Sequence, residues 1–142
     1  MNSVALVGPG AVGLYYGGLL ARSGAALHVL ARSDATALRE DGIQMRMMDP
    51  RGGGLIATHG VTPASVERKA AMIGAVDCVI IAAKATVNSD VLSSLQALVK
   101  PGRTVLLTLQ NGMGNAEFFA DHFPENPVLA GLCFVCGTRT AP

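Results

Sequence analysis

The sequence contains no tryptophan, and aromatic residues make up only 4% of its 142 residues. Surfaces that bind single-stranded nucleic acid by stacking depend on such side chains. The 11 Lys and Arg residues nearly balance the 10 Asp and Glu residues, which leaves a formal net charge of +1. Proteins that bind nucleic acid or an acidic membrane usually carry a strongly basic face. We therefore expect neither nucleic acid nor a membrane as a partner.

Long apolar runs, a basic leader and a cysteine framework are missing too. No apolar stretch approaches the ~20 residues that span a bilayer, and the first three residues lack the positive charge of a signal peptide. We expect a soluble, cytoplasmic protein. Three cysteines argue against a set of disulfides. Cys133 and Cys136 lie in an apolar run without two further zinc ligands, so we expect buried structural thiols and no metal site.

Hydrophobic residues, by contrast, make up 50% of the chain, and glycine is abundant at 17 residues. Apolar segments alternate with segments of helical periodicity. This alternation predicts one α/β domain over residues 1–142, with a Rossmann-like, doubly wound, mainly parallel sheet and helices on both faces. The expected strands are Ser3–Val7, 26–31, 78–83, 104–109 and 128–135, and Ile43–Met48 with 55–59 form a hairpin. The expected helices are 12–23, a short one from a cap at Ser33 or Asp34 to Asp41, 62–73, 91–99, and one around Phe118, Phe119 and Phe123.

A glycine-rich stretch follows the first expected strand, and its sequence is Gly8-Pro9-Gly10-Ala11-Val12-Gly13. Between a strand and a helix, the first glycine of such a stretch permits a tight turn and the second lets a pyrophosphate approach the backbone. The third lets the helix and strand pack closely. The helix that follows carries its larger apolar residues on one side, namely Val12, Tyr15, Tyr16, Leu19 and Leu20. The pattern predicts a dinucleotide site at the amino end of this helix.

Four residues suited to binding stand at the ends of four expected strands, namely Gly8, Arg32, Lys84 and Asn111. Parallel strands bring their carboxyl ends to one edge of the sheet, and ligands bind there. NAD sites usually carry an acidic residue where Arg32 stands, whereas an arginine can bind a 2′-phosphate. We therefore expect NADP(H) as the cofactor.

Each of these side chains also has a simpler interpretation. Arg32 could be a solvated surface residue, and Lys84 could extend to the surface instead of binding a phosphate, a ribose hydroxyl or a substrate carboxylate. Asn111 could orient the nicotinamide or hold a substrate hydroxyl or carbonyl, or it could belong to an ordinary Asn-Gly turn.

Several motifs together resemble the ketopantoate reductase (2-dehydropantoate 2-reductase) family, in the family's order and with similar spacing. They are the glycine stretch, Leu30-Ala31-Arg32, Val79-Ile80-Ile81-Ala82-Ala83-Lys84-Ala85 and Leu109-Gln110-Asn111-Gly112-Met113-Gly114. That family reduces a 2-oxo acid with NADPH in pantothenate biosynthesis. The resemblance implies that Gly8 to Gly13 hold the pyrophosphate, Arg32 the 2′-phosphate, and Lys84 the cofactor. It places Asn111 by the nicotinamide and substrate, and Gly137 at a further backbone contact with the cofactor. Val87 departs from the glutamine that many members carry.

The resemblance covers only the family's amino-terminal half. The family's catalytic lysine and much of its substrate site lie in a helical C-terminal domain that nothing in these residues matches. The resemblance therefore implies NADPH binding with little or no reductase activity alone, and no catalytic residue here beyond the substrate contact of Asn111. Removal of a second domain would expose apolar surface around residues 129–135 and favour self-association.

Two other functions stay open: the NADP-binding domain of another hydroxy- or oxo-acid dehydrogenase, and a stand-alone, non-catalytic NADPH-binding module. A methyltransferase that uses S-adenosylmethionine is less favoured, because Arg32 stands where an acidic ribose ligand is expected.

Overall fold

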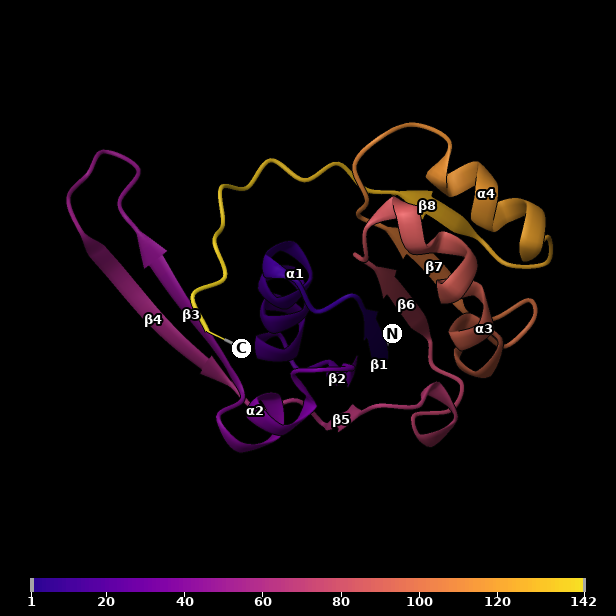
Figure 1. The fold of residues 1–142 in the computed structure, drawn as a ribbon, viewed down its shortest axis with the longest axis horizontal. Coiled ribbons are helices and arrows are strands. Elements are labelled where there is room, and N and C mark those ends of the chain that lie inside the picture. The colour runs from indigo at the N-terminus through magenta and orange to yellow at the C-terminus, as the bar shows by residue number, and fades with distance from the viewer. Residues whose placement is uncertain (1, 142) are drawn as a thin grey trace.

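The computed structural model describes residues 2–141, and a six-stranded parallel sheet forms its centre (Figure 1). The strands are β1 (Ser3–Val7), β2 (Ala26–Leu30), β5 (Ser65–Glu67), β6 (Cys78–Ile81), β7 (Val105–Thr108) and β8 (Val128–Ala130). Their order across the sheet is β5-β2-β1-β6-β7-β8. The chain thus builds outward from β1 in one direction, then starts again at β6 and builds in the other. This order confirms the predicted doubly wound α/β fold, and its switch point lies between β1 and β6.

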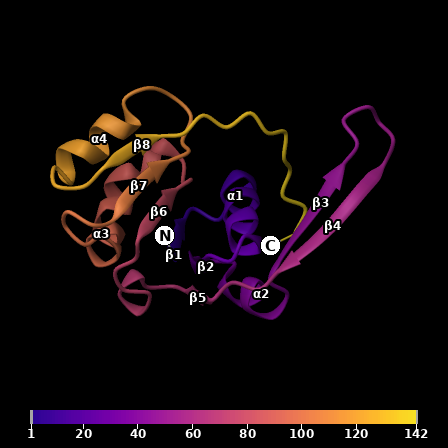
Figure 2. The same cartoon turned by 180° about the vertical axis from the view of Figure 1, so that it is seen from behind.

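Helices cover both faces of the sheet, as the two views in Figures 1 and 2 show. They are α1 (Ala11–Arg22), α2 (Ala35–Glu40), α3 (Asn88–Leu98) and α4 (Asn115–His122), with short 3-10 turns η1 (Ala70–Met72) and η2 (Ala85–Val87). Alternate residues of β1 serve opposite faces. Val4 and Leu6 belong to the core under α1, and Ala5 and Val7 belong to the core under α3 and α4. Burial on both faces explains why the central strands are apolar throughout.

Glycine, not the larger apolar residues, forms the buried face of α1. Gly13, Gly17 and Gly18 are its buried residues, whereas the predicted apolar side is only partly buried. A Cβ built on Gly17 would lie 3.3 Å from the Leu6 side chain and 3.4 Å from that of Leu27. At Gly17 the helix approaches the sheet too closely to admit a larger side chain, while Tyr15 and Leu20 of the apolar side are partly buried and pack against the same core.

The predicted helix at 62–73 is also wrong. Residues Ser65–Glu67 form the edge strand β5 in parallel register with β2, followed by η1. Val66 is 4% exposed, and the Ser65 hydroxyl lies 3.0 Å from Nδ1 of His28. A Thr-Pro pair can open an edge strand as well as a helix, since neither needs the proline N–H. Pairing with β2 therefore overrides the local helix signal.

The predicted hairpin is present, formed by β3 (Ile43–Met48) and β4 (Leu55–Val61) in antiparallel register. It projects away from the main sheet, and its far end carries the glycine-rich turn (Figure 1). Met48 and Ile56 near this end are 61% and 65% exposed. The glycine run at 52–54 is thus a hairpin tip, as expected, and lies apart from the main sheet edge.

The predicted last strand at 128–135 ends early. β8 stops at Ala130, and the amide of Gly131 makes a further hydrogen bond to the Thr108 carbonyl, at 2.8 Å. We call residues 131–141 the tail. It leaves the sheet without strand pairing and runs back past α1 toward the hairpin (Figures 1 and 2). Leu132 and Phe134 are 85% and 93% exposed.

The three cysteines differ in burial, depending on whether they lie in the sheet or in the tail. Cys78 lies in β6, and burial raises the pKa of its thiol, as expected of an inert core residue. Cys133 is half-buried and Cys136 is exposed, so the expectation of buried thiols at these two positions was wrong. Both belong to the tail, which does not enter the sheet.

The other predicted elements are confirmed, with ends that differ by one to a few residues. α1, β2, β6, α3 and β7 all form close to where periodicity placed them. Within residues 2–141, no helix combines the length and apolar character needed to cross a membrane.

Candidate functional site

The glycine loop, residues 8–13, joins β1 to α1 at the switch point of the sheet. Gly8 has a φ of +93°, and a Cβ there would overlap the backbone of Ala83, which follows β6. A Cβ on Gly13 would lie 2.5 Å from the Gly8 carbonyl oxygen and 3.0 Å from Leu6. A Cβ on Gly10 would meet nothing within 4 Å. The first and third glycines are therefore required by packing, while the second leaves the backbone open to the cleft.

The amino end of α1 opens beside this loop. Its cap residue is Gly10, which offers no side-chain cap, and its first turn contains no acidic residue. The first amide groups of a helix lack intrahelical partners and carry a partial positive charge. This end of α1 therefore suits an anion, provided that other groups nearby also bind one.

A cleft of about 350 Å³ lies at the carboxyl ends of β1, β2 and β6. Five of the residues predicted to bind cofactor line it: Gly8, Pro9, Gly10, Arg32 and Lys84. Val87 and Val91 add apolar walls. Val87 stands where many family members carry a glutamine, so this position offers no polar side chain to the cleft. The structure thus brings together predicted binding residues that follow three different strands, β1, β2 and β6.

The remaining predicted residues lie outside this cleft. Ala11 and Gly137 line a neighbouring cavity of about 1250 Å³ between α1, β3 and the tail, and a Cβ on Gly137 would lie 3.9 Å from that of Ala11. Val12 and Gly13, in the first turn of α1, and Asn111, just after β7, line neither cavity.

Arg32 and Lys84 are the cations of the cleft that have no partner. Both side chains are exposed, and among residues 2–141 neither makes a hydrogen bond or an ion pair. Arg32 follows the buried Ala31 after β2, and Lys84 precedes η2 after β6. Two uncompensated positive charges on one cleft make it suitable for a polyanion.

A chain of side-chain amides holds the next strand end. Nε2 of Gln110 donates to the Ala83 carbonyl at 2.8 Å and to Oδ1 of Asn88 at 2.7 Å. Nδ2 of Asn88 donates to Oδ1 of Asn115 at 3.1 Å. Nδ2 of Asn115 then donates to the carbonyls of Asn111 and Gly112, at 3.1 Å and 3.2 Å. This chain fixes the backbone of the 110–114 loop against the end of β6.

Sequence reasoning singled out Asn111 but missed Asn88, Gln110 and Asn115 as the residues that hold its loop. Asn115 is 8% exposed at the start of α4. A buried asparagine needs hydrogen-bond partners. The only sequence signal was the polar cluster around Asn-Gly, and it does not reveal that Asn88, 27 residues away, supplies one of the partners.

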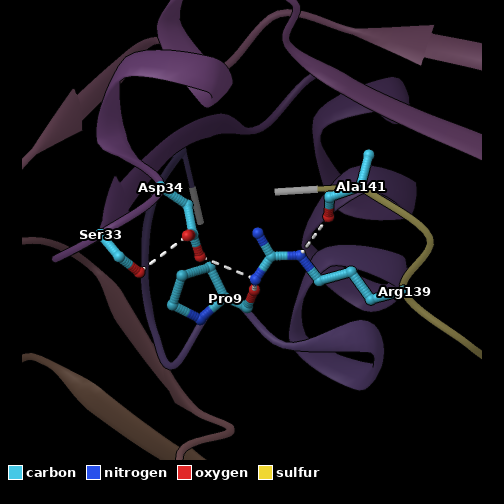
Figure 3. Close-up of polar contacts among 5 residues, drawn as sticks. All are labelled: Pro9, Ser33, Asp34, Arg139 and Ala141. Atoms are coloured by element: carbon cyan, nitrogen blue, oxygen red, sulfur yellow. Dashed lines mark hydrogen bonds and ion pairs between the residues drawn. The ribbon is translucent and has the colours of Figure 1, made fainter.

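A second arginine enters the cleft from the tail. Nη1 of Arg139 lies 2.7 Å from Oδ2 of Asp34 and donates to the Pro9 carbonyl at 3.3 Å (Figure 3). Its Nε donates to the Ala141 carbonyl at 2.9 Å, and the Ser33 hydroxyl donates to Oδ1 of Asp34 at 2.7 Å. The hydrogen bonds from Arg139 and then Ser33 hold the pKa of Asp34 below its usual range.

Asp34 was expected to cap α2 if Ser33 did not, and neither side chain makes a capping hydrogen bond. Its carboxylate is used instead to bind Arg139, a residue 105 positions later in the sequence. Nothing in the local pattern of the tail indicated that Arg139 would return to the glycine loop.

The sheet order, the glycine loop at its switch point and the strand-end cleft define a Rossmann-type α/β domain. Sequence comparison then identifies the family. Residues 4–142 match the family model described as ketopantoate reductase PanE/ApbA, and the chain belongs to this family. The resemblance inferred from the motifs is thereby confirmed.

Individual relatives agree with this assignment. The chain is 34% identical over 142 residues to a 2-dehydropantoate 2-reductase of Halobacterium salinarum, covering 98% of this chain and 44% of the relative. It is 30% identical over 135 residues to one from Nostoc sp., covering 95% of this chain and 40% of the relative. The crystal structure of 2-dehydropantoate 2-reductase from Geobacter metallireducens superposes with a TM-score of 0.84 at 34% identity, covering 99% of this chain and 44% of that one. The chain thus spans less than half the length of these relatives.

Proposed function

We propose that this chain is the NADPH-binding part of a 2-dehydropantoate 2-reductase-like oxidoreductase. The cofactor would lie across the carboxyl ends of β1, β2 and β6, with its pyrophosphate at the glycine loop. The proposed substrate is a 2-oxo acid, 2-dehydropantoate, because the curated relatives carry the name of that reductase.

The observation that carries this proposal is the pair of unpartnered cations on the cleft. Arg32 stands where a Rossmann domain meets the adenosine ribose, and an arginine there suits a 2′-phosphate. Lys84 supplies a second charge from the end of β6 on the same cleft. A carboxylate at the position of Arg32 would favour the free ribose hydroxyls of NAD instead.

The backbone at the loop fits a dinucleotide as well. The open position at Gly10 and the uncapped amino end of α1 provide amide donors without a side chain in the way. A bound NADPH would supply a hydride for reduction of a carbonyl. The loop at 110–114, fixed by its amides, would hold Asn111 beside the nicotinamide and the substrate.

We expect these residues to bind the cofactor but to turn over little substrate alone. Reduction of a carbonyl needs a positioned proton donor as well as a hydride source. The family resemblance places that donor, a lysine, in the helical second half, and the chain covers only 40% and 44% of two curated relatives that it matches. Turnover of 2-dehydropantoate by this chain at rates typical of a complete enzyme would contradict this expectation.

The cofactor assignment is tested by titrating NADPH and NADH into the wild-type chain and into Arg32→Ala. We expect wild type to bind NADPH more tightly. Loss of a hydrogen-bonded charge pair costs about 1.5–3 kcal/mol, so Arg32→Ala should weaken NADPH binding by about tenfold to a hundredfold. Binding of NADH, which lacks the phosphate, should change little.

Arg103→Ala is the matched control, because Arg103 is exposed before β7, at the opposite edge of the sheet. It should leave both dissociation constants unchanged. Equal losses for the two cofactors in Arg32→Ala would contradict the assignment of the 2′-phosphate, and a wild-type chain that binds neither cofactor would overturn the proposed function.

A further inference from the structure

Arg32, Asp34 and Arg139 line the same cleft, and Arg139 contacts Asp34 directly. Asp34 lies two residues after Arg32, where the 2′-phosphate of the proposed cofactor would bind. A carboxylate at this end of a Rossmann cleft usually favours NAD, because it accepts hydrogen bonds from the ribose hydroxyls. It also repels a phosphate. Asp34 therefore works against the selectivity that Arg32 would provide, unless its charge is compensated.

Arg139 provides that compensation. Its guanidinium lies 2.7 Å from Oδ2 of Asp34, and the Ser33 hydroxyl donates to Oδ1. Both carboxylate oxygens are therefore engaged. The side chains of Arg139 and Asp34 are only 27% and 20% exposed, so solvent screens this pair less than it would a fully exposed one.

Protonation would not remove the charge of Asp34 at neutral pH. The same two hydrogen bonds lower the pKa of Asp34, so the carboxylate stays ionised. The charged groups that line the cleft are Arg32, Asp34, Lys84 and Arg139. With Arg139 on Asp34, the charges of Arg32 and Lys84 remain uncompensated. Without Arg139, Asp34 could instead bind the adjacent Arg32 or the ribose of an NAD-type cofactor.

We propose that Arg139 is a specificity-determining residue: it masks the Asp34 carboxylate and thereby makes this end of the cleft selective for a dinucleotide with a 2′-phosphate. This inference rests on the proposed function and names the device that sets its cofactor preference. Arg139 also donates to the Pro9 carbonyl, which keeps the guanidinium beside the glycine loop (Figure 3). The tail thus contributes to the cleft through a side chain that the four binding motifs do not include.

The test is a double-mutant cycle with Arg139→Gln, Asp34→Asn and the double variant, in which Kd is measured for NADPH and for NADH. Arg139→Gln unmasks Asp34 and should raise the Kd of NADPH by about tenfold, while the Kd of NADH stays the same or falls. Asp34→Asn should not weaken NADPH. The double variant has neither charge and should bring the Kd of NADPH back to within about threefold of wild type.

A purely structural role for the pair gives a different pattern. If Arg139→Gln weakened both cofactors equally, and Asp34→Asn did the same alone, then the pair would only hold the loops together and the inference would be wrong. Failure of the double variant to recover NADPH binding would also overturn it. Arg139→Lys, which keeps the charge, should preserve the preference, and it provides the comparison if Arg139→Gln folds poorly.

The outcome for this inference is separable from that for the proposed function. A preference for NADPH that disappears in Arg32→Ala but persists in Arg139→Gln would refute the masking role alone. A preference that is absent from wild type would refute the cofactor assignment, and with it the basis for the masking role.

Discussion

Two loops at the same edge of the sheet are held in opposite ways. The glycine loop after β1 is fixed because side chains are absent, so that Gly8 lies against the backbone of Ala83 and Gly13 against that of Gly8. The loop at 110–114 is fixed because side chains are present, since Asn88, Gln110 and Asn115 supply its hydrogen bonds. At Gly8 and Gly13 the first arrangement leaves no room for a side chain, whereas the second depends on each donor and acceptor. The two loops should therefore fail differently when they are mutated.

The largest effect is expected from Gly8→Ala. The new Cβ would overlap the backbone of Ala83 in a residue whose φ is +93°. A left-handed conformation costs a non-glycine residue roughly 1–2 kcal/mol, and overpacking costs about 1–3 kcal/mol more. We expect the free energy of unfolding, measured by urea denaturation, to fall by about 3 kcal/mol or more.

Gly24→Ala is the matched control, because Gly24 has a φ of +102° and a Cβ there would meet nothing within 4 Å. It should show only the conformational cost, about 1–2 kcal/mol. If the two variants lost equal stability, close packing against Ala83 would not be what fixes the glycine loop.

Asn115→Ala should have an intermediate effect. It removes the donor to the Asn111 and Gly112 carbonyls and the acceptor for Asn88. Unsatisfied buried polar groups cost about 1–3 kcal/mol. Gln96→Ala, at an exposed position of α3, should change stability by no more than about 0.5 kcal/mol.

Hydrogen exchange separates the two loops in the same Asn115→Ala protein. Amides at 110–114 should exchange faster, while those of the glycine loop keep their wild-type rates. Unchanged exchange at 110–114 would show that the amide chain does not hold this loop.

The smallest effect is expected at the opposite edge of the sheet, where a carboxylate holds the start of β1. Oδ2 of Asp77 accepts hydrogen bonds from the amides of Asn2 and Ser3, at 2.8 Å and 3.1 Å. These bonds lower the pKa of Asp77, so they add stability above its ordinary pKa of about 4 and lose it as pH falls through the lowered value.

Asp77→Asn should therefore reduce stability slightly at pH 7. Its difference from wild type should shrink as the pH falls well below about 4, where Asp77 of the wild type is protonated as well. Thermal melts across this range measure the difference. A difference that is constant with pH would mean that the charge of Asp77 contributes nothing beyond the hydrogen bonds that an amide can also accept.

The features that could be predicted from the sequence are those that local patterns determine, and the features that were missed depend on contacts between distant residues. β1, β2, β6 and β7 and the glycine loop follow from local patterns, and the structure places Arg32 and Lys84 on the expected cleft. The edge strand β5 was predicted as a helix because its pairing with β2 is a distant contact that local periodicity does not contain. Residues 131–135, the first part of the tail, were predicted to continue the strand at 128–130 because they are apolar, but this strand lies at the edge of the sheet and pairs only with β7.

The polar contacts that complete the cleft were the least predictable. Asp34 and Arg139 are 105 residues apart, and each has an ordinary local interpretation, as a helix cap and as part of a polar tail. The amide chain likewise joins α3, β7 and α4 through residues that any loop could contain. Such contacts depend on the assembled fold, so single-sequence patterns identify the edge where ligands bind but not all of the residues there.

The close packing of Gly8 against the backbone of Ala83 affects both the entropy and the rate of ligand binding. A loop whose backbone is pressed against a neighbouring strand end has few conformations to lose when a ligand arrives. Ordering costs that reduce affinity elsewhere are then largely absent, so under the proposed function the loop would be preorganised for the pyrophosphate of the cofactor. The association rate of the proposed cofactor should therefore be set by diffusion and charge, without a slow rearrangement of the protein.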